Sequence, residues 1–263
     1  MKKTVIAAAL ASTVFSGAAM AWSAGSNGGN VEIGGNIQIT PYTTPWEVEV
    51  GAPAATLNAN ITKGTKVVMI PVTKAIPVLG IRPVSKTPFA GAVGINPQIS
   101  YNGAVQINNF VEGDTVLDLP VMDADNPTTQ IGAMETTFTA AALTSWVNHT
   151  SGNKGQYSTW APNAGYGFWG GVGQSAHAVL TGTKVIGVLT DLTPTFVQNY
   201  NDQGASFDNA SKTSFTSTEN TTFSGVYGGG IQAGQKIKLT LTNPAADDVI
   251  KWKASLPITV SYQ

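Results

Sequence analysis

The chain has 263 residues with 14 basic and 15 acidic side chains, a formal net charge of −1 at pH 7, and no cysteine. Charged residues make up only 11% of the sequence, whereas soluble domains usually carry about 25%. Such sparse and balanced charge argues against nucleic-acid binding, which needs clustered Lys and Arg to displace counterions. The absence of cysteine excludes disulfide bridges, thiol catalysis and cysteine-ligated metals.

The first residues have the pattern of a targeting segment. Two lysines precede an apolar run from Val5 to Phe15, and Ala19 and Ala21 then provide the small residues that signal peptidase recognises. The run is too short for a membrane-spanning helix. We therefore expect a signal peptide over residues 1–21 and a mature, exported chain that begins at Trp22.

Apolar and polar side chains alternate over residues 27–40, behind a lead that is rich in Ser, Gly and Asn. Such alternation predicts a half-buried strand. Its apolar row consists of Val31, Ile33, Ile37 and Ile39, with Gly35 interrupting it. The strand either pairs as an edge within its own sheet or, because the lead ties it only loosely to its own domain, completes the sheet of a neighbouring molecule.

Alternation continues along most of the remaining chain, broken often by Gly, Pro and Asn. It predicts strands over residues 46–50, 66–70, 98–101, 104–107, 115–121, 134–147, 177–189, 222–227, 235–241 and 256–262. Turns are expected at Asn102-Gly103 and at Glu112-Gly113-Asp114. Residues 140–146 and 194–200 also have helical character, although neither stretch is long enough to drive the fold. The whole pattern predicts an all-β sandwich of short strands with small helical decorations.

The middle of the chain differs from its two ends. Residues 148–177 and 201–221 are rich in Gly, Asn, Ser and aromatic residues and show little regular alternation. Long loops on a regular frame are where binding surfaces usually lie. We therefore expect an inserted loop and short-helix region, a candidate binding region, over about residues 148–221.

The sequence contains no recognisable catalytic or metal-binding pattern. His149 and His177 stand alone, without a second ligand at metal-binding spacing. Asp123 and Asp125 resemble the start of a calcium loop, but no glycine or late glutamate follows in register. We therefore predict no enzyme, no metal and no cofactor. A secreted β-sandwich hydrolase is the least favoured alternative, which an activity screen on glycans would reveal.

One stretch of the expected inserted region combines aromatic rings with amides and hydroxyls. Its candidate glycan-binding residues are Tyr157, Trp160, Asn163, Tyr166, Phe168 and Trp169. Proteins bind sugars by placing flat aromatic faces against C–H surfaces and by hydrogen bonding to the ring hydroxyls. The stretch is therefore either a glycan-binding surface or a satellite core in which the aromatic residues pack under a long loop.

The last stretch of the sequence is also strand-like, because Leu256, Ile258, Val260 and Tyr262 alternate with other residues up to the final position. A plain sandwich that begins with one edge strand and ends with another would explain it.

Several short motifs are shared with one known family. They are Asn30-Val31-Glu32-Ile33-Gly34-Gly35-Asn36-Ile37, Trp46-Glu47-Val48 with Val50-Gly51, Phe168-Trp169-Gly170-Gly171, Gly230-Ile231-Gln232-Ala233-Gly234-Gln235, and Trp252 and Leu256 before the closing Ile258-Thr259-Val260-Ser261-Tyr262. With these motifs the chain resembles the K-88-type (F-4-type) fimbrial subunits and adhesins of enterobacteria, which the chaperone–usher pathway assembles. The absence of cysteine agrees with this branch of the pilins.

The resemblance implies an incomplete immunoglobulin-like β-sandwich of the pilin type over residues 41–263, completed by a donor strand from another subunit. Residues 22–40 would be the donor-strand extension. Its donor positions would be Val31, Ile33, Gly35, Ile37 and Ile39, with Gly35 over a shallow pocket. The acceptor and chaperone edge would be Leu256, Ile258, Val260 and Tyr262.

The same resemblance implies the partners and the location. A periplasmic chaperone would fill the open groove first, an outer-membrane usher would assemble the fibre, and neighbouring fimbrial subunits would replace the chaperone. The product would be an extracellular, cell-surface fimbrium that adheres to a host glycan or glycoprotein receptor. The alternative is a secreted, self-contained carbohydrate-binding β-sandwich domain, in which the opening strand pairs within its own sheet.

Overall fold

The computed structural model describes residues 44–54, 57–217, 219–246 and 249–263. The signal peptide expected over residues 1–21 and the donor strand expected within 22–40 lie outside these residues. The same holds for the five donor positions Val31, Ile33, Gly35, Ile37 and Ile39.

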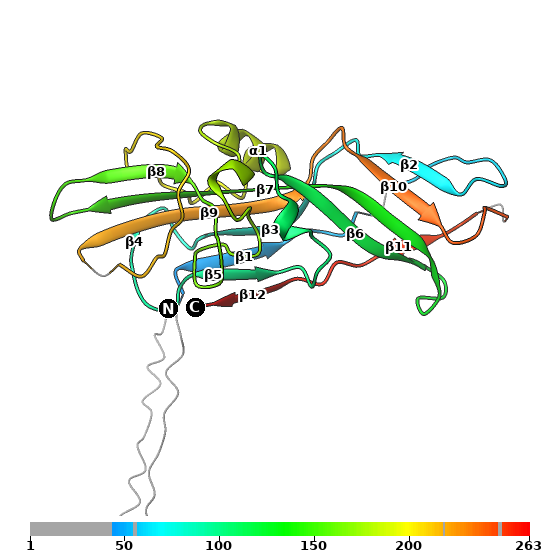
Figure 1. Cartoon of the computed structure of the whole chain (residues 1–263), viewed down its shortest axis with the longest axis horizontal. Coiled ribbons are helices and arrows are strands. Elements are labelled where there is room, and N and C mark those ends of the chain that lie inside the picture. Colours follow the sequence, from blue (N-terminus) through cyan, green and yellow to red (C-terminus); the bar gives the residue numbers. More distant parts are fainter. Residues whose placement is uncertain (1–43, 55–56, 218, 247–248) are drawn as a thin grey trace, which may run out of the picture. The chain divides into compact units, whose positions relative to one another are not determined.

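The described part of the chain consists mainly of antiparallel strands with one short α-helix, which confirms the predicted all-β class (Figure 1). The elements are β1 Trp46–Val50, β2 Val67–Pro71, β3 Ile76–Pro83, β4 Phe89–Ala90, β5 Pro97–Ser100, the 3-10 helix η1 Ile107–Asn109, β6 Asp114–Asp123, β7 Gln130–Asn148, β8 Lys154–Ser158, the 3-10 helix η2 Ala176–Ala178, α1 Lys184–Leu192, β9 Thr221–Ile231, β10 Lys236–Leu241, β11 Trp252–Ala254 and β12 Thr259–Tyr262.

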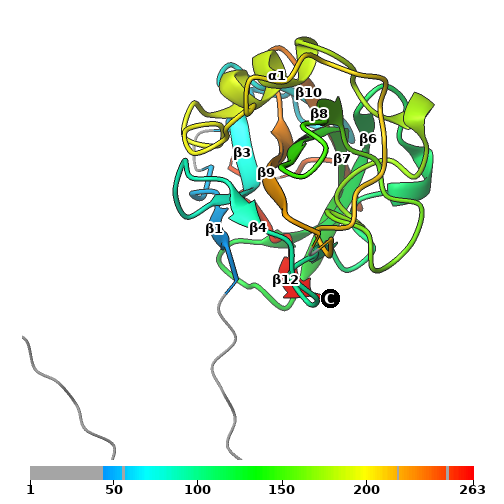
Figure 2. The same cartoon turned by 90° about the vertical axis from the view of Figure 1, so that its left-hand side faces the viewer.

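The long strand β7 organises the large sheet, whose strand order is β1-β3-β9-β7-β10-β2. Its first half pairs with β6 and β10, and its second half pairs with β8 and β9. The C-terminal strand β12 lies outside this sheet and pairs only with β5 among the described strands. Figure 2, which looks at one end of the molecule, shows β1 and β12 on the same side of this part of the chain.

Most predicted strands are present with small shifts of their ends, but the strand predicted over residues 177–189 is wrong. That stretch contains η2 and most of α1. The buried residues of α1 are Val185, Leu189 and Leu192, whose spacing of four and three residues follows the period of a helix rather than that of a strand. The helical option for residues 140–146 is also wrong. These residues form the second half of β7, because a strand on each edge of β7 satisfies their backbone groups.

Two further strands are shorter than predicted or absent. Residues 104–107 make one isolated bridge, Val105 to Leu117, and then enter η1. The strand predicted over residues 256–262 begins only at Thr259, and Pro257 cannot donate a ladder hydrogen bond. Both predicted turns are confirmed. Asn102-Gly103 and Glu112-Gly113 have left-handed backbones, with φ of 53° and 82° and of 48° and 86°.

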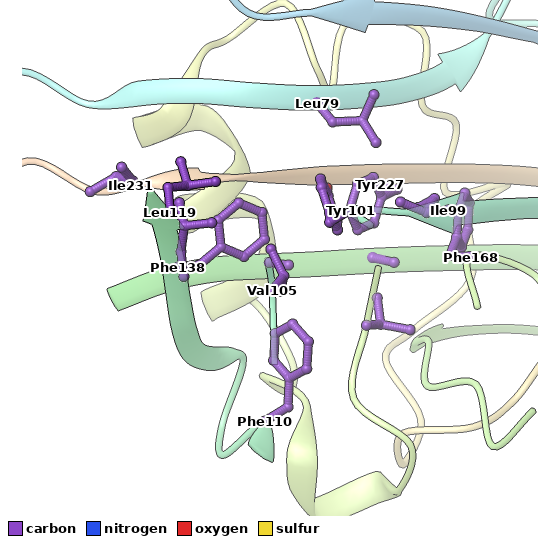
Figure 3. Close-up of a cluster of buried hydrophobic side chains, with 14 of the residues drawn as sticks. Leu79, Ile99, Tyr101, Val105, Phe110, Leu119, Phe138, Phe168, Tyr227 and Ile231 are labelled. Carbon is purple, nitrogen blue, oxygen red and sulfur yellow. The ribbon is translucent and has the colours of Figure 1, made fainter. Parts of the chain in front are cut away.

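Two apolar clusters lie on the two faces of the large sheet. The larger cluster includes Leu79, Phe138 and Tyr227 from the sheet and Ile99 and Tyr101 from β5 and the residue after it (Figure 3). The hydroxyls of Tyr101 and Tyr227 hydrogen bond to each other at 2.6 Å within it. The smaller cluster lies under α1, between the helix and strands β7 and β9.

Close packing on the α1 side depends on two paired glycines. Gly80 on β3 and Gly228 on β9 are register partners, and the buried ring of Phe196 lies directly over both. A Cβ atom at Gly80 would be 2.2 Å from the ring, and one at Gly228 would be 2.5 Å from it. The helical option for residues 194–200 is wrong, because the segment around Phe196 forms turns. These turns place the Phe196 ring against the backbone of the two glycines.

Candidate functional site

The C-terminal strand β12 has a hydrogen-bonded neighbour on one edge only within the described residues. It pairs antiparallel with β5, from Thr259 opposite Ser100 to Tyr262 opposite Pro97. The ladder continues for one more step, because the backbones of Gln263 and Asn96 exchange two hydrogen bonds of 3.1 and 2.9 Å. The opposite edge of β12 has no ladder partner among these residues.

The four residues expected to form the acceptor edge share one side of the chain. Leu256, Ile258, Val260 and Tyr262 are all half-buried and pack against the larger apolar cluster, while the residues between them are exposed. A strand with one covered face normally buries that face fully when both of its edges are paired. These four side chains therefore contact the core and remain partly exposed to solvent.

Strand β1 also leaves apolar side chains uncovered on its core-facing side. Trp46, Val48 and Val50 lie on one face of β1, yet only Trp46 is buried, and Val48 and Val50 are 41% and 61% exposed. The other face of β1 is occupied. Glu47 pairs with Arg82 at 2.5 Å and accepts a hydrogen bond from Asn199 at 3.1 Å.

The end of β12 meets the start of β1 through one side-chain contact. The hydroxyl of Tyr262 hydrogen bonds with the Thr44 side chain. Burial raises the pKa of Tyr262, and the hydrogen bond from Thr44 opposes that shift only in part. We name Val48, Val50, Leu256, Ile258 and Val260 the open margin, since these apolar residues remain uncovered or half-covered beyond this contact.

The candidate glycan-binding residues divide into one core residue and five surface residues. Phe168 is fully buried and stacks 6.0 Å from Tyr227, with edge contacts to Trp46 and Phe215. Its ring therefore cannot contact a ligand, and its left-handed backbone (φ 64°) serves to turn it inward. The other candidates are half-buried, namely Tyr157, Trp160, Tyr166 and Trp169, or exposed, namely Asn163.

Three chain segments lie side by side beneath this surface. The backbone of Ser211 donates to Ser158 and accepts from Trp160, at 3.0 and 3.1 Å. Two residues later, the carbonyl of Thr213 accepts from Gly167 at 2.9 Å. The segment of residues 211–213 is thus held between the end of β8 and the turn that carries Tyr166.

Lys212 occupies the middle of this arrangement and was not among the residues predicted from sequence. Its ammonium lies 5.8 Å from the centroid of the Trp160 ring and 5.2 Å from that of Tyr166. We name Trp160, Tyr166 and Lys212 the ring–lysine platform. The sequence signal for it is weak, because Lys212 is separated from both rings by about fifty residues of irregular chain.

Strand β5 connects the ring–lysine platform to the C-terminal strand. Opposite its edge with β12, the carbonyl of Pro97 accepts from Phe168 and the amide of Ile99 donates to Trp169, both at 2.8 Å. The buried side chain of Gln98 donates to the carbonyl of Tyr166 at 2.9 Å and accepts from Gly165 at 3.0 Å. Both candidate surfaces therefore share this one strand.

The residues considered for metal or acid–base chemistry have structural contacts. Within the described residues, His149 and His177 are exposed, and His149 contacts the Thr222 hydroxyl at 2.9 Å. Asp123 closes a turn by accepting from the backbone amides of Asp125 and Asn126 at 2.8 and 3.2 Å. The described part of the chain also contains no helix of the length and apolarity that a membrane span requires.

Within the described residues, the chain is a mainly antiparallel β subunit whose C-terminal strand has a ladder neighbour on one edge. A family model described as "Fimbrial, major and minor subunit" matches residues 1–263, and the chain belongs to this family, the K88 fimbrial subunits.

Comparison with curated proteins gives the same result. The chain is 30% identical to K88 fimbrial protein AB of Escherichia coli over 289 aligned residues, and 29% identical to K88 fimbrial proteins AC and AD of the same organism, with all of both chains covered in each case. The protein is therefore a non-enzymatic subunit of surface fimbriae that assembles with other fimbrial subunits. The resemblance noted in the sequence motifs is confirmed.

Proposed function

We propose that copies of this chain polymerise by donor-strand exchange at the open margin. Residues 22–40 of one subunit would add a strand to the unpaired edge of β12 in the next. The observation that supports this most directly is that β12 pairs on only one edge within the described residues, near apolar side chains of β1 that are 41% and 61% exposed on a core-facing side. An added strand would pair with the second edge of β12 and would cover the exposed apolar side chains of β1.

The expected energetics suit a durable joint. The donor residues Val31, Ile33, Ile37 and Ile39 would each contribute about 1.5–3 kcal/mol on full burial, or roughly 6–12 kcal/mol together. Each ladder hydrogen bond adds about 1 kcal/mol, and association costs at least about 4 kcal/mol. Gly35 would lie where the acceptor row leaves no room for a side chain.

An open margin of this kind needs a cover before assembly, because exposed apolar edges cause aggregation. A periplasmic chaperone would cover the margin, an outer-membrane usher would order the exchange, and the subunit would reach the fimbrium through the periplasm after loss of residues 1–21. In the competing arrangement the chain is a self-contained sandwich whose own residues 27–40 pair internally.

A peptide-complementation experiment separates these two arrangements. The chain lacking residues 22–40 is expressed, and a synthetic peptide of residues 27–40 is added while the melting temperature and the oligomeric state are followed. We expect an unstable or aggregating protein that the peptide converts to a monomer with a sharply higher melting temperature. Stable folding of the shortened chain without the peptide would disprove donor-strand exchange. A peptide with Ile33 and Ile37 replaced by Asp is the matched control.

We also propose that the surface around the ring–lysine platform adheres to host glycans or glycoproteins. The half-buried rings of Tyr157, Trp160, Tyr166 and Trp169 and the exposed amide of Asn163 support this, since aromatic faces and amides are the groups that bind sugars. Phe168 is left out of this proposal because it is buried.

Adhesion is tested by replacing Trp160 or Trp169 with Ala and measuring binding to an array of host glycans. We expect loss of sugar binding with normal fibre assembly. Trp252→Ala is the control, because Trp252 is another half-buried tryptophan, placed on β11 against β6. If glycan binding is unchanged in both the Trp160 and the Trp169 variant, the rings serve only to pack the loops.

A further inference from the structure

The lysine of the ring–lysine platform lies over two aromatic rings. The ammonium of Lys212 lies 5.8 and 5.2 Å from the ring centroids of Trp160 and Tyr166. The residue is exposed, while its neighbour Thr213 is buried. The charged side chain of Lys212 is therefore exposed to solvent beside the two rings.

The backbone fixes this arrangement before any ligand arrives. Residues 211–213 are hydrogen bonded to Ser158 and Trp160 on one side and to Gly167 on the other. The Trp160 ring nitrogen also donates to the carbonyl of Ala210 at 3.4 Å. Groups that are positioned in advance lose little conformational freedom on binding, which favours recognition.

Among the described residues, the ammonium has no carboxylate partner. The ion pairs among the described residues are Arg82 with Glu47, Lys238 with Glu135 and Lys251 with Asp125, and Lys212 takes part in none of them. A cation that has no carboxylate partner among the described residues and lies over two aromatic rings suits a ligand that has both C–H surface and negative charge. Hydrogen bonds from an ammonium to an anionic oxygen are stronger than those to a neutral hydroxyl.

We propose that the platform selects anionic saccharides, which carry a carboxylate as in sialic acid or a sulfate ester, over neutral ones. The rings would contact the apolar face of the sugar, and Lys212 would donate to the acidic oxygen. This proposal rests on the glycan adhesion proposed above and specifies the chemical class of its ligand.

The test measures the affinity of purified fimbriae of the full chain for 3′-sialyllactose, 3′-sulfolactose and lactose at low and high salt. We expect at least one acidic sugar to bind about tenfold more tightly than lactose, as one charge-assisted hydrogen bond would give, and the difference to shrink at high salt. Comparison of the two acidic sugars shows whether carboxylate or sulfate is preferred.

Variants assign the preference to Lys212. Lys212→Met keeps an apolar stem against the rings and should remove the preference for acidic sugars, measured as the ratio of each acidic-sugar affinity to the lactose affinity. Lys212→Arg should keep the preference. Lys184→Met removes an exposed lysine on α1 and should change nothing.

The outcomes separate this inference from glycan adhesion itself. Equal affinity for lactose and both acidic sugars, unchanged in Lys212→Met, would overturn the inference and leave the adhesion proposal standing. Failure of all three sugars and of the wider glycan array to bind would overturn both. A preference that persists in Lys212→Met would overturn the role of Lys212.

Discussion

At the scale of single residues, the contact between Phe196 and two glycines is a tight constraint on the sequence. The ring is buried over Gly80 and Gly228, where an added Cβ would lie 2.2 and 2.5 Å from ring atoms. An aromatic ring is rigid, and a close-packed interior has no space into which to move it. Positions 80 and 228 therefore need glycine, because any side chain there would overlap the Phe196 ring.

We predict that Gly80→Ala lowers the free energy of unfolding by about 1–3 kcal/mol, because it overpacks this contact. Denaturant unfolding of the peptide-complemented chain measures the change. Combining the substitution with Phe196→Leu should recover part of the loss, as a double-mutant cycle would show.

Gly187→Ala in α1 is the control, and its effect on stability should have the opposite sign. It has open space around its Cβ position and should stabilise the protein by up to about 1 kcal/mol. Equal effects of the two alanines would contradict the packing explanation.

At the scale of elements, β5 has hydrogen-bonded neighbours of two kinds. One edge carries β12, and the other carries the turn of residues 165–169. The side chain of Gln98 fastens that turn through both its amide nitrogen and its carbonyl oxygen. A strand of four residues thus joins the acceptor edge to the loop that presents Tyr166.

Replacing Gln98 with Leu should release this turn while leaving the large sheet intact. The change leaves the amide of Gly165 and the carbonyl of Tyr166 without these partners, at a cost of about 1–3 kcal/mol for each buried group. Hydrogen exchange should become faster at Gly165 and Gly167 and stay unchanged in β9. Gln174→Leu removes a surface hydrogen bond to Asn108 and is the control. Unchanged exchange at Gly165 would show that Gln98 does not hold the turn.

The elements also show which features a single sequence can predict. Alternation identified β6 and β10 because each has one buried and one exposed face, and it identified β1 because its apolar and acidic residues alternate. It did not identify β3, which contains Pro77, Gly80 and Pro83 and is buried on much of both faces. It misassigned α1, since a helix of nine residues carries too few turns to establish its period.

The candidate sites were predictable to different degrees. The half-buried row from Leu256 to Tyr262 follows local alternation, so its burial pattern could be predicted from the sequence, whereas its role as an acceptor edge is a proposal. The placement of Phe168 depends on a left-handed backbone and on contacts with Trp46 and Tyr227, which no local pattern encodes. Lys212 joins the rings only because residues 211–213 return to lie beside β8.

At the scale of the whole molecule, the described part of the chain contains tyrosines that are buried, Tyr101 and Tyr227, and others that are half-buried, Tyr157, Tyr200 and Tyr262. Burial raises the pKa of Tyr101, Tyr157, Tyr200, Tyr227 and Tyr262 above the usual value of 10.0. Above pH 10 these tyrosine hydroxyls lose their protons in the unfolded chain, whereas in the folded chain they keep them up to a higher pH. Their contribution to stability is complete below pH 10 and is lost as the pH rises towards the raised values.

We predict a steep loss of stability above pH 10. Each such tyrosine contributes a slope of up to about 1.4 kcal/mol per pH unit. Unfolding of the peptide-complemented chain between pH 8 and 12 measures it. Replacing both Tyr101 and Tyr227 with Phe should flatten the alkaline limb by about two protons, while Tyr166→Phe, on the surface, serves as the comparison. An alkaline limb of unchanged slope in the double variant would show that this pair does not govern it.

The position of β5 has a mechanical consequence for a fibre built as proposed. If the fibre were loaded along β12, the hydrogen bonds between β12 and β5 would share that load in shear and would not open one after another. A displacement of β5 under this load would also displace the turn of residues 165–169, because Gln98 on β5 is hydrogen bonded to it. The surface that would hold the host therefore lies one strand away from the line along which the fibre is pulled.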